Sequence, residues 1–315
     1  MNIFVTMISV MAHWRFMLMK VIEYFRDSRL ASKICCLLLL GPIMHACKGT
    51  DEWHEKADVF KLVVSSDALM NPSEEDIYPR MKDIGLFSLD WSGKRTEVFD
   101  NQKAVYNGRK WYLENGREVW LGTDSMNVYT YSPFVPGLES DTWLPVRTGD
   151  VDYMYGRHLV FQYGFINRYQ PVAYVNMVHS MAFIKMDLRP IREQLGKISR
   201  IAIRNTDINR PVYETAELNL LNGEIRYGAK RLAGFECVMH PSGDMAYLYA
   251  VPCKDSSFNI EIVVNGKLYT MAVRSMALEG AKMQNFWLDF DVKQMKLFLR
   301  DITIQPWDDR GEIEL

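Results

Sequence analysis

The stretch IEIVVNGKLYTMAV, residues 260–273, decides the fold class of this chain. On both sides of Asn265-Gly266, apolar residues alternate with others, which is the pattern of a strand with one buried face. Asn and Gly both tolerate positive φ, so the pair favours a tight turn between antiparallel strands. The stretch therefore predicts a β-hairpin. Other Asn-Gly pairs predict further hairpins: Asn107-Gly108, Asn115-Gly116 and Asn222-Gly223.

Outward from this hairpin, short strand-like segments recur about every ten residues, which is the spacing of β-sandwich proteins. Residues 132–149 are rich in Pro and Gly and predict a loop, and only residues 191–195 look helical. The pattern predicts an all-β fold. Because the chain is long for one sandwich, we expect two in tandem, at residues 59–168 and 169–315, joined in the loop-rich stretch 150–170.

The overall composition is that of a globular protein. The chain has 315 residues, 48% of them hydrophobic and 24% charged. Lys and Arg number 37 against 39 Asp and Glu, a net charge of −2. A nucleic-acid-binding protein is expected to carry a basic surface, so this balance argues against a nucleic-acid partner.

Residues 1–46 predict a secretory signal. The apolar run 34–46 is shorter than the ~20 residues that span a bilayer, and it precedes Cys47. A buried helix is the other interpretation, but Gly41-Pro42 would interrupt such a helix. Because the region before the run is long for a signal, Met19 is an alternative start. Basic residues precede the run: Lys20, Arg26, Arg29 and Lys33.

The end of this region, Met44-His45-Ala46-Cys47, resembles a bacterial lipobox. In that motif the cysteine is acylated and becomes the first residue of the mature chain. Two or more acyl chains suffice for stable membrane attachment. We therefore expect Cys47 to anchor the protein to a membrane, with residues 47–58 as a polar tether.

Two cysteines remain to be explained in the mature chain, Cys237 and Cys253. An exported pair is a candidate disulfide. Two separate buried thiols are the other interpretation. It is favoured because a turn at residues 241–244 would place Cys237 opposite Leu248 rather than Cys253.

The sequence carries no recognisable catalytic motif. No nucleophile elbow, phosphate loop, HExxH or CxxC occurs, so we expect no enzyme activity and no cofactor. The mature histidines lack metal-ligand spacing, which predicts no metal site; they are His54, His158, His179 and His240. The aromatic residues Trp111, Tyr112 and Trp120 either pack in a core or stack on sugars.

Several segments, in order, resemble the fimbrillin-like family, the lipoprotein subunits and adhesins of type V pili. Residues 107–111 and 119–120 are followed by VYTYSPF at 128–134, which is similar to the core of that family's first domain. Other similar segments are 151–156, 177–186 with its central His179, 289–292 and 301–307.

The resemblance implies two β-sandwich domains of a transthyretin-like, Greek-key type. It also implies a fimbrial subunit or accessory adhesin on the outer membrane or in the fimbrium, with a host or bacterial surface ligand. In such subunits a protease removes the first strand, and another subunit adds a strand in its place. Here the removable strand would be residues 59–69, with cleavage at Arg80. His179 would be structural.

The C-terminal tail, residues 308–315, is short and acidic for an extra donor strand, which favours a tip or accessory role. A surface lipoprotein that binds glycans through an exposed aromatic platform is the alternative function. Burial of Trp111 and Trp120 would favour the fimbrial interpretation, and a flat exposed pair would favour glycan binding.

Overall fold

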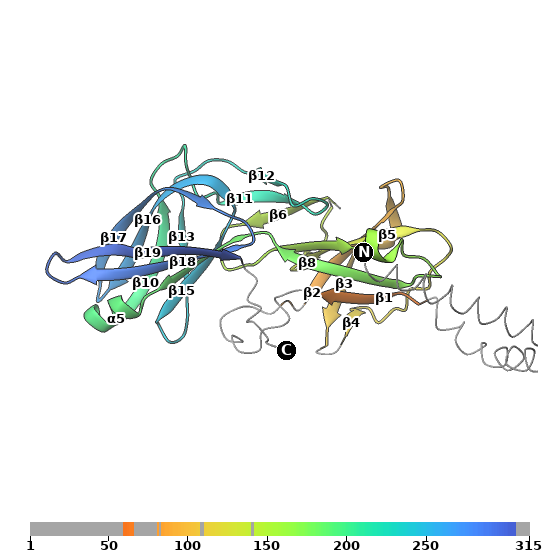
Figure 1. Cartoon of the computed structure of the whole chain (residues 1–315), viewed down its shortest axis with the longest axis horizontal. Coiled ribbons are helices and arrows are strands. Elements are labelled where there is room, and N and C mark those ends of the chain that lie inside the picture. Colours follow the sequence, from red (N-terminus) through yellow and green to blue (C-terminus); the bar gives the residue numbers. More distant parts are fainter. Residues whose placement is uncertain (1–58, 66–80, 82, 108–109, 140–141, 307–315) are drawn as a thin grey trace, which may run out of the picture. The chain divides into compact units, whose positions relative to one another are not determined.

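The computed structural model describes residues 59–65, 81, 83–107, 110–139 and 142–306, and Figure 1 shows their arrangement. The predicted signal, Cys47, the tether, Arg80 and residues 307–315 lie outside the described residues. Strands dominate the described part, with two short helices, α4 (Val160–Tyr163) and α5 (Arg189–Leu195). The all-β prediction is confirmed, and α5 covers the only stretch that looked helical.

The first sheet has seven strands, in the order β1-β8-β7-β5-β2-β3-β4. Its strands are mostly antiparallel; β1 is the exception, because it runs parallel to β8 at the edge of the sheet. The strands are β1 (Lys61–Ser65), β2 (Asp83–Asp90), β3 (Arg95–Tyr106), β4 (Trp111–Leu113), β5 (Met126–Ser132), β7 (Met154–His158) and β8 (Val172–His179).

A four-stranded and a five-stranded sheet follow, in the orders β13-β10-β16-β17 and β14-β15-β9-β18-β19. Their strands are β9 (Ala182–Asp187), β10 (Ile198–Asn205), β13 (Gly234–Glu236), β14 (Val238–Met239), β15 (Met245–Ala250), β16 (Cys253–Val264), β17 (Lys267–Leu278), β18 (Lys282–Asp291) and β19 (Lys296–Pro306). A three-stranded sheet, β12-β11-β6, consists of β6 (Trp143–Arg147), β11 (Thr215–Asn219) and β12 (Ile225–Tyr227).

The hairpin predicted from residues 260–273 is formed by β16 and β17. Val264 lies opposite Lys267, and the two residues between them have positive φ, 51° at Asn265 and 75° at Gly266. Asn222-Gly223 connects the antiparallel strands β11 and β12. Asn115-Gly116 forms a turn, but the chain after it makes a single bridge, Val59 with Trp120, instead of a strand.

Two strands form where the sequence predicted loops. Residues 154–158 form β7 within the loop-rich stretch 150–170. Residues 143–147 form β6 within the stretch that the sequence assigned to a loop. Pro145 has no N–H to donate, and a proline is tolerated in a strand that has a neighbour on one side only. β6 is such a strand, since it pairs with β11 alone.

The largest hydrophobic core lies between the four-stranded and the five-stranded sheets. Phe258 and Ile260 from β16 and Phe286 from β18 are fully buried in it. Ile184 of β9 and Leu248 of β15 complete the same cluster. Alternate residues of each strand point inward, as a sandwich requires. This packing confirms the sandwich architecture.

The seven-stranded sheet is covered on both faces. One face carries Leu86 and Val175 in a core of its own. The other face contributes Phe87 and Tyr131 to a cluster that also contains Phe183 of β9. The two clusters explain why β2 is buried at six consecutive residues.

The division at residues 168 and 169 stays a prediction. Two pairings cross that point: β8 belongs to the seven-stranded sheet with β1 and β7, and β6 pairs with β11.

Candidate functional site

The first strand lies at an edge of its sheet and is held by few backbone contacts. β1 pairs with β8 alone, in parallel register from Lys61 opposite Val172 to Ser65 opposite Asn176. Just before it, the Phe60 N–H donates to the Val119 carbonyl at 2.8 Å. An edge strand of five residues can leave without breaking any other strand pair of the sheet.

The inward side chains of this segment cover part of a hydrophobic core. The ring centroid of Phe60 lies 4.5 Å from that of Phe99, and Leu62 and Val64 pack on the same cluster. Val63 faces the other way and is 46% exposed. The alternation means that the segment fills an apolar groove with every second residue.

The groove under β1 is lined by β8 and its neighbours. Ala173, Val175 and Met177 of β8 are buried in the cluster that β1 covers. If β1 left, their side chains and the β8 backbone groups that now pair with it would meet water. Unpaired backbone groups beside an apolar groove form a template for an incoming strand.

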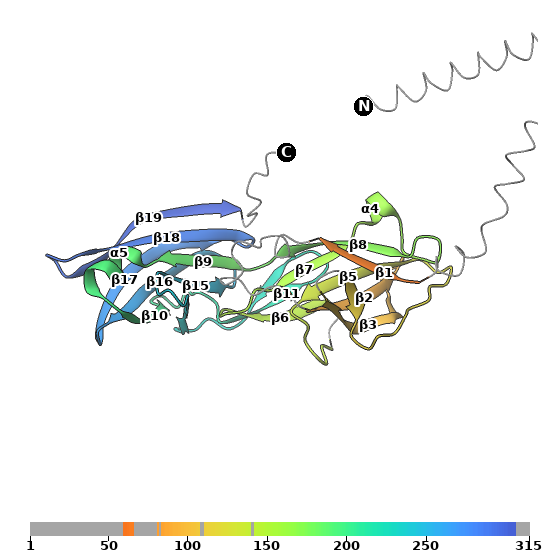
Figure 2. The same ribbon diagram turned by 90° about the horizontal axis from the view of Figure 1, so that it is seen from below.

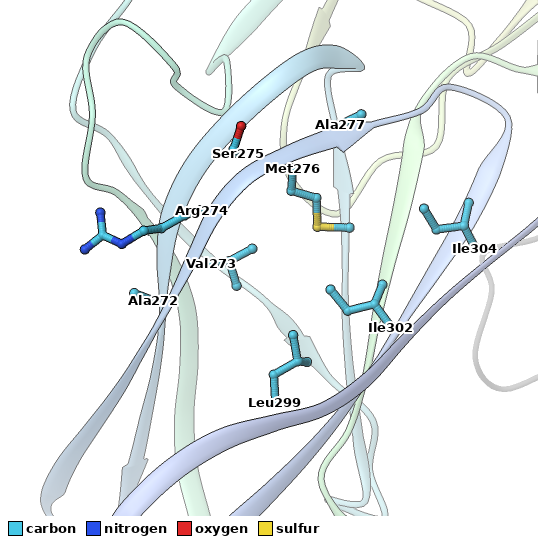
Figure 3. A pocket seen from close by; sticks show the side chains of 9 residues that line it. All are labelled: Ala272, Val273, Arg274, Ser275, Met276, Ala277, Leu299, Ile302 and Ile304. Atoms are coloured by element: carbon cyan, nitrogen blue, oxygen red, sulfur yellow. The ribbon is translucent and has the colours of Figure 1, made fainter.

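A second groove lies between the edge strands of two sheets, β17 and β19. Its volume is about 440 Å³. Figure 3 shows the side chains of Met276, Leu299 and Ile302 pointing toward one another, while Arg274 points away. Here β17 departs from regular pairing, since Ser275 has a φ of 55° and the register with β16 shifts nearby.

A third hollow, of about 570 Å³, lies along the five-stranded sheet and is lined by both charged and apolar side chains. Asp187 accepts hydrogen bonds from the backbone and the guanidinium of Arg189. Burial would raise the pKa of Asp187, but these bonds outweigh it and hold the pKa below its ordinary value. Trp287 at the wall of this hollow is 39% exposed.

The two cysteines of the described region are free thiols in this structure. Cys253 belongs to β16, and Cys237 lies between β13 and β14. Burial raises the pKa of the Cys237 thiol to about 12. The β14-β15 hairpin has Val238 opposite Tyr247, the register that the sequence predicted for this turn.

Trp111 and Trp120 do not form a shared platform. Trp111 is 7% exposed and packs in the core, with its ring centroid 5.4 Å from that of Tyr106. Trp120 is 59% exposed. The two tryptophans therefore do not form the flat, exposed pair that would favour glycan binding.

His179 occupies a structural position. Its Nδ1 lies 2.7 Å from Oδ2 of Asp152, and both side chains are largely buried. Within the described ranges no group of three His, Cys, Asp or Glu side chains is placed to hold a metal ion. No helix among the described residues has the length and apolar character needed to cross a membrane.

No protein-family model and no curated protein matches this sequence. The fold is similar to that of a candidate cell adhesion protein from Bacteroides uniformis, with a TM-score of 0.60 and 12% identity over 79% of this chain and 98% of that one. A candidate cell adhesion protein from Bacteroides ovatus gives a TM-score of 0.57 and 12% identity over 78% and 96%. The tip fimbrial protein Mfa3 from Porphyromonas gingivalis gives 0.44 and 9% over 79% and 100%.

These similarities concern the fold. At that level, the first two agree with the all-β sandwich fold that the resemblance to the fimbrillin-like family implied. The chain has the fold of these Bacteroides candidate cell adhesion proteins.

Proposed function

We propose that this protein is a fimbrial subunit or accessory adhesin of the bacterial cell surface, without enzymatic activity. The observation that carries the proposal is the edge position of β1, which fills an apolar groove beside β8. The cell adhesion role suggested for the two proteins of similar fold supports it. So does the ordered set of sequence segments that resembles the fimbrillin-like family.

The edge position of β1 supports the proposed assembly step. Cleavage after Arg80 releases the chain up to that residue, and β1 then leaves the sheet edge. A strand from another subunit takes its place, pairs with β8 and inserts alternate apolar side chains where Phe60, Leu62 and Val64 now lie. The incoming strand restores both the hydrogen bonds and the covered core.

Before assembly, the subunit is held on the membrane through Cys47. Acylation there would hold the exported subunit on the outer membrane until cleavage frees it. Mass spectrometry of the membrane-extracted protein tests this step: a diacylated or triacylated N-terminal cysteine is expected. A mature chain that begins elsewhere, without lipid, would contradict the anchor.

Polymer formation tests the function as a whole. Surface fractions of cells that express the full chain are treated with an arginine-specific protease, which does not cut at Lys82, and examined by electron microscopy and unboiled SDS gels. We expect fibres and an SDS-resistant ladder that require cleavage. Arg80→Ala should abolish both, whereas Lys82→Ala, two residues away, should leave them unchanged. A monomer under every condition would reject the assembly role.

A further inference from the structure

Four segments of the chain meet at one end of the seven-stranded sheet, here called the entry end. β1 and β8 begin there, since Lys61 lies opposite Val172. β7 ends there, and Asp90 at the end of β2 lies opposite Met126 at the start of β5. The entry end therefore consists of residues 59–60, the connections 91–94 and 159–171, and residues 118–125 of the connection before β5.

The entry end collects the most exposed aromatic side chains. Among the residues that the structure describes, every aromatic side chain that is more than half exposed lies there: Trp91 at 78%, Trp120 at 59%, Phe161 at 106% and Tyr169 at 79%. Phe161 belongs to α4, which projects from the sheet (Figure 2). Gathered exposed aromatics on a soluble domain mark a surface that meets an apolar partner.

Backbone hydrogen bonds hold these loops in place. The Arg168 N–H donates to the Gly122 carbonyl at 2.8 Å, which ties the loop of Tyr169 to that of Trp120. Met126 and Ile166 exchange two N–H···O bonds of 2.9 Å. These loops are therefore ordered, and their aromatic rings are exposed on a preformed surface.

The short distance along the chain from Cys47 to the entry end indicates which partner this surface contacts. Val59 bridges to Trp120, so the chain enters the fold at the entry end. Cys47 lies twelve residues earlier, and twelve residues reach at most about 40 Å. If Cys47 is acylated, as the proposed function requires, the bilayer lies within that reach of the entry end.

The charge of the entry end fits an uncharged or weakly charged lipid surface. Its connections carry as many basic as acidic residues, so attraction to a polyanion does not explain the surface. They are Lys94 and Arg168 against Glu118 and Asp124. Trp and Tyr rings place an apolar body and a polar tip at the boundary between headgroups and acyl chains.

We propose that the entry end is a membrane-docking surface, on which Trp120, Phe161 and Tyr169 insert into the lipid interface and hold the anchored subunit against the bilayer. The partner is a phospholipid surface. This contact supplements the lipid anchor, because one weak surface and one acyl anchor together bind more durably than either alone.

The test uses the mature chain from Lys48 to Leu315 without an acyl group, which retains the whole compact unit Asp58–Leu315. Its partition onto vesicles of phosphatidylethanolamine and phosphatidylglycerol is measured by flotation. The triple variant Trp120→Ser/Phe161→Ser/Tyr169→Ser should lose about tenfold or more in partition. A matched triple, Tyr227→Ser/Leu232→Ser/Leu268→Ser, changes side chains exposed by 44%, 61% and 53% elsewhere and should stay within about twofold of the unaltered chain.

A second readout locates the contact. Brominated lipids should quench the tryptophan fluorescence of the unaltered chain, and Trp91→Phe/Trp120→Phe should remove most of that quenching. Absence of vesicle binding by the unaltered chain, or equal losses in both triple variants, would overturn the proposal. The proposal would also be overturned if a glycan or a protein bound through these three rings while vesicles did not.

The outcome is separable from the proposed function. Polymer formation depends on Arg80 and β1, and acylation is read directly at Cys47. A chain that floats with vesicles but never polymerises retains the docking surface and loses the assembly role. A chain that polymerises but does not bind vesicles keeps the assembly role and loses the docking surface.

Discussion

At the scale of single residues, Phe60 is the main apolar contact of the first segment. Its ring lies 4.5 Å from Phe99 and is partly buried. We expect Phe60→Ala to lower the free energy of unfolding by about 1–2 kcal/mol, less than the 3–5 kcal/mol of a fully buried Phe. Urea denaturation measures it. Val63→Ala, on the exposed side of β1, is the control and should change stability by less than about 0.5 kcal/mol.

The two thiols are a second residue-scale prediction. Burial raises the pKa of the Cys237 thiol to about 12, so this thiol stays protonated at pH 8. Burial also raises the pKa of Cys253. Iodoacetamide should therefore modify neither thiol rapidly in the native mature chain, and both in urea. If denatured, unreduced protein shows no reactive thiol at these positions, the two cysteines are bonded.

At the scale of elements, β1 should be replaceable. A chain that begins at Met81 lacks β1 and should expose the groove beside β8. We expect it to bind a synthetic peptide of residues 59–69 and to bind a hydrophobic dye more strongly than the longer chain does. A scrambled peptide of the same composition is the control, because it keeps the hydrophobicity but loses the alternation that fits the groove. Equal binding of both peptides would contradict a specific strand site.

The turn between β16 and β17 is a second element-scale prediction. Gly266 has a φ of 75°, which costs a residue with a Cβ about 1–2 kcal/mol. Gly266→Ala should lower the free energy of unfolding by about that amount in chemical denaturation. Gly149→Ala is the matched control, since Gly149 lacks positive φ and an added Cβ would meet nothing within 4 Å. A larger loss at Gly149 would refute this account of the turn.

At the scale of the whole molecule, stability should fall in acid. The pKa of Asp187 is lowered from 3.8 in the folded state, where the opposing effect of burial is outweighed by hydrogen bonds from Arg189. A lowered folded-state pKa stabilises the fold above 3.8, and this contribution disappears as the pH falls through the folded-state pKa. Thermal denaturation below about pH 4 should show the decline. Asp187→Asn should reduce this loss of stability at low pH, whereas Glu279→Gln, at an exposed carboxyl, should not.

The sequence alone determined many of the strands and several of their turns. Alternation of apolar residues and the Asn265-Gly266 pair are local features, and the β16-β17 hairpin needs only neighbouring residues to form. The same local reasoning failed at β6, where Pro145 masked a strand whose partner, β11, lies far along the chain.

Only the tertiary structure decided which distant segments meet. The parallel pairing of β1 with β8 joins residues 111 positions apart, Lys61 and Val172. The pairing of β4 with β3 places Trp111 in a core, whereas Trp120, which bridges to Val59, stays on the surface. The reason is physical: periodicity specifies which side of a strand is apolar, whereas the choice of neighbour depends on packing over the whole sheet. That choice created both the groove under β1 and the aromatic entry end.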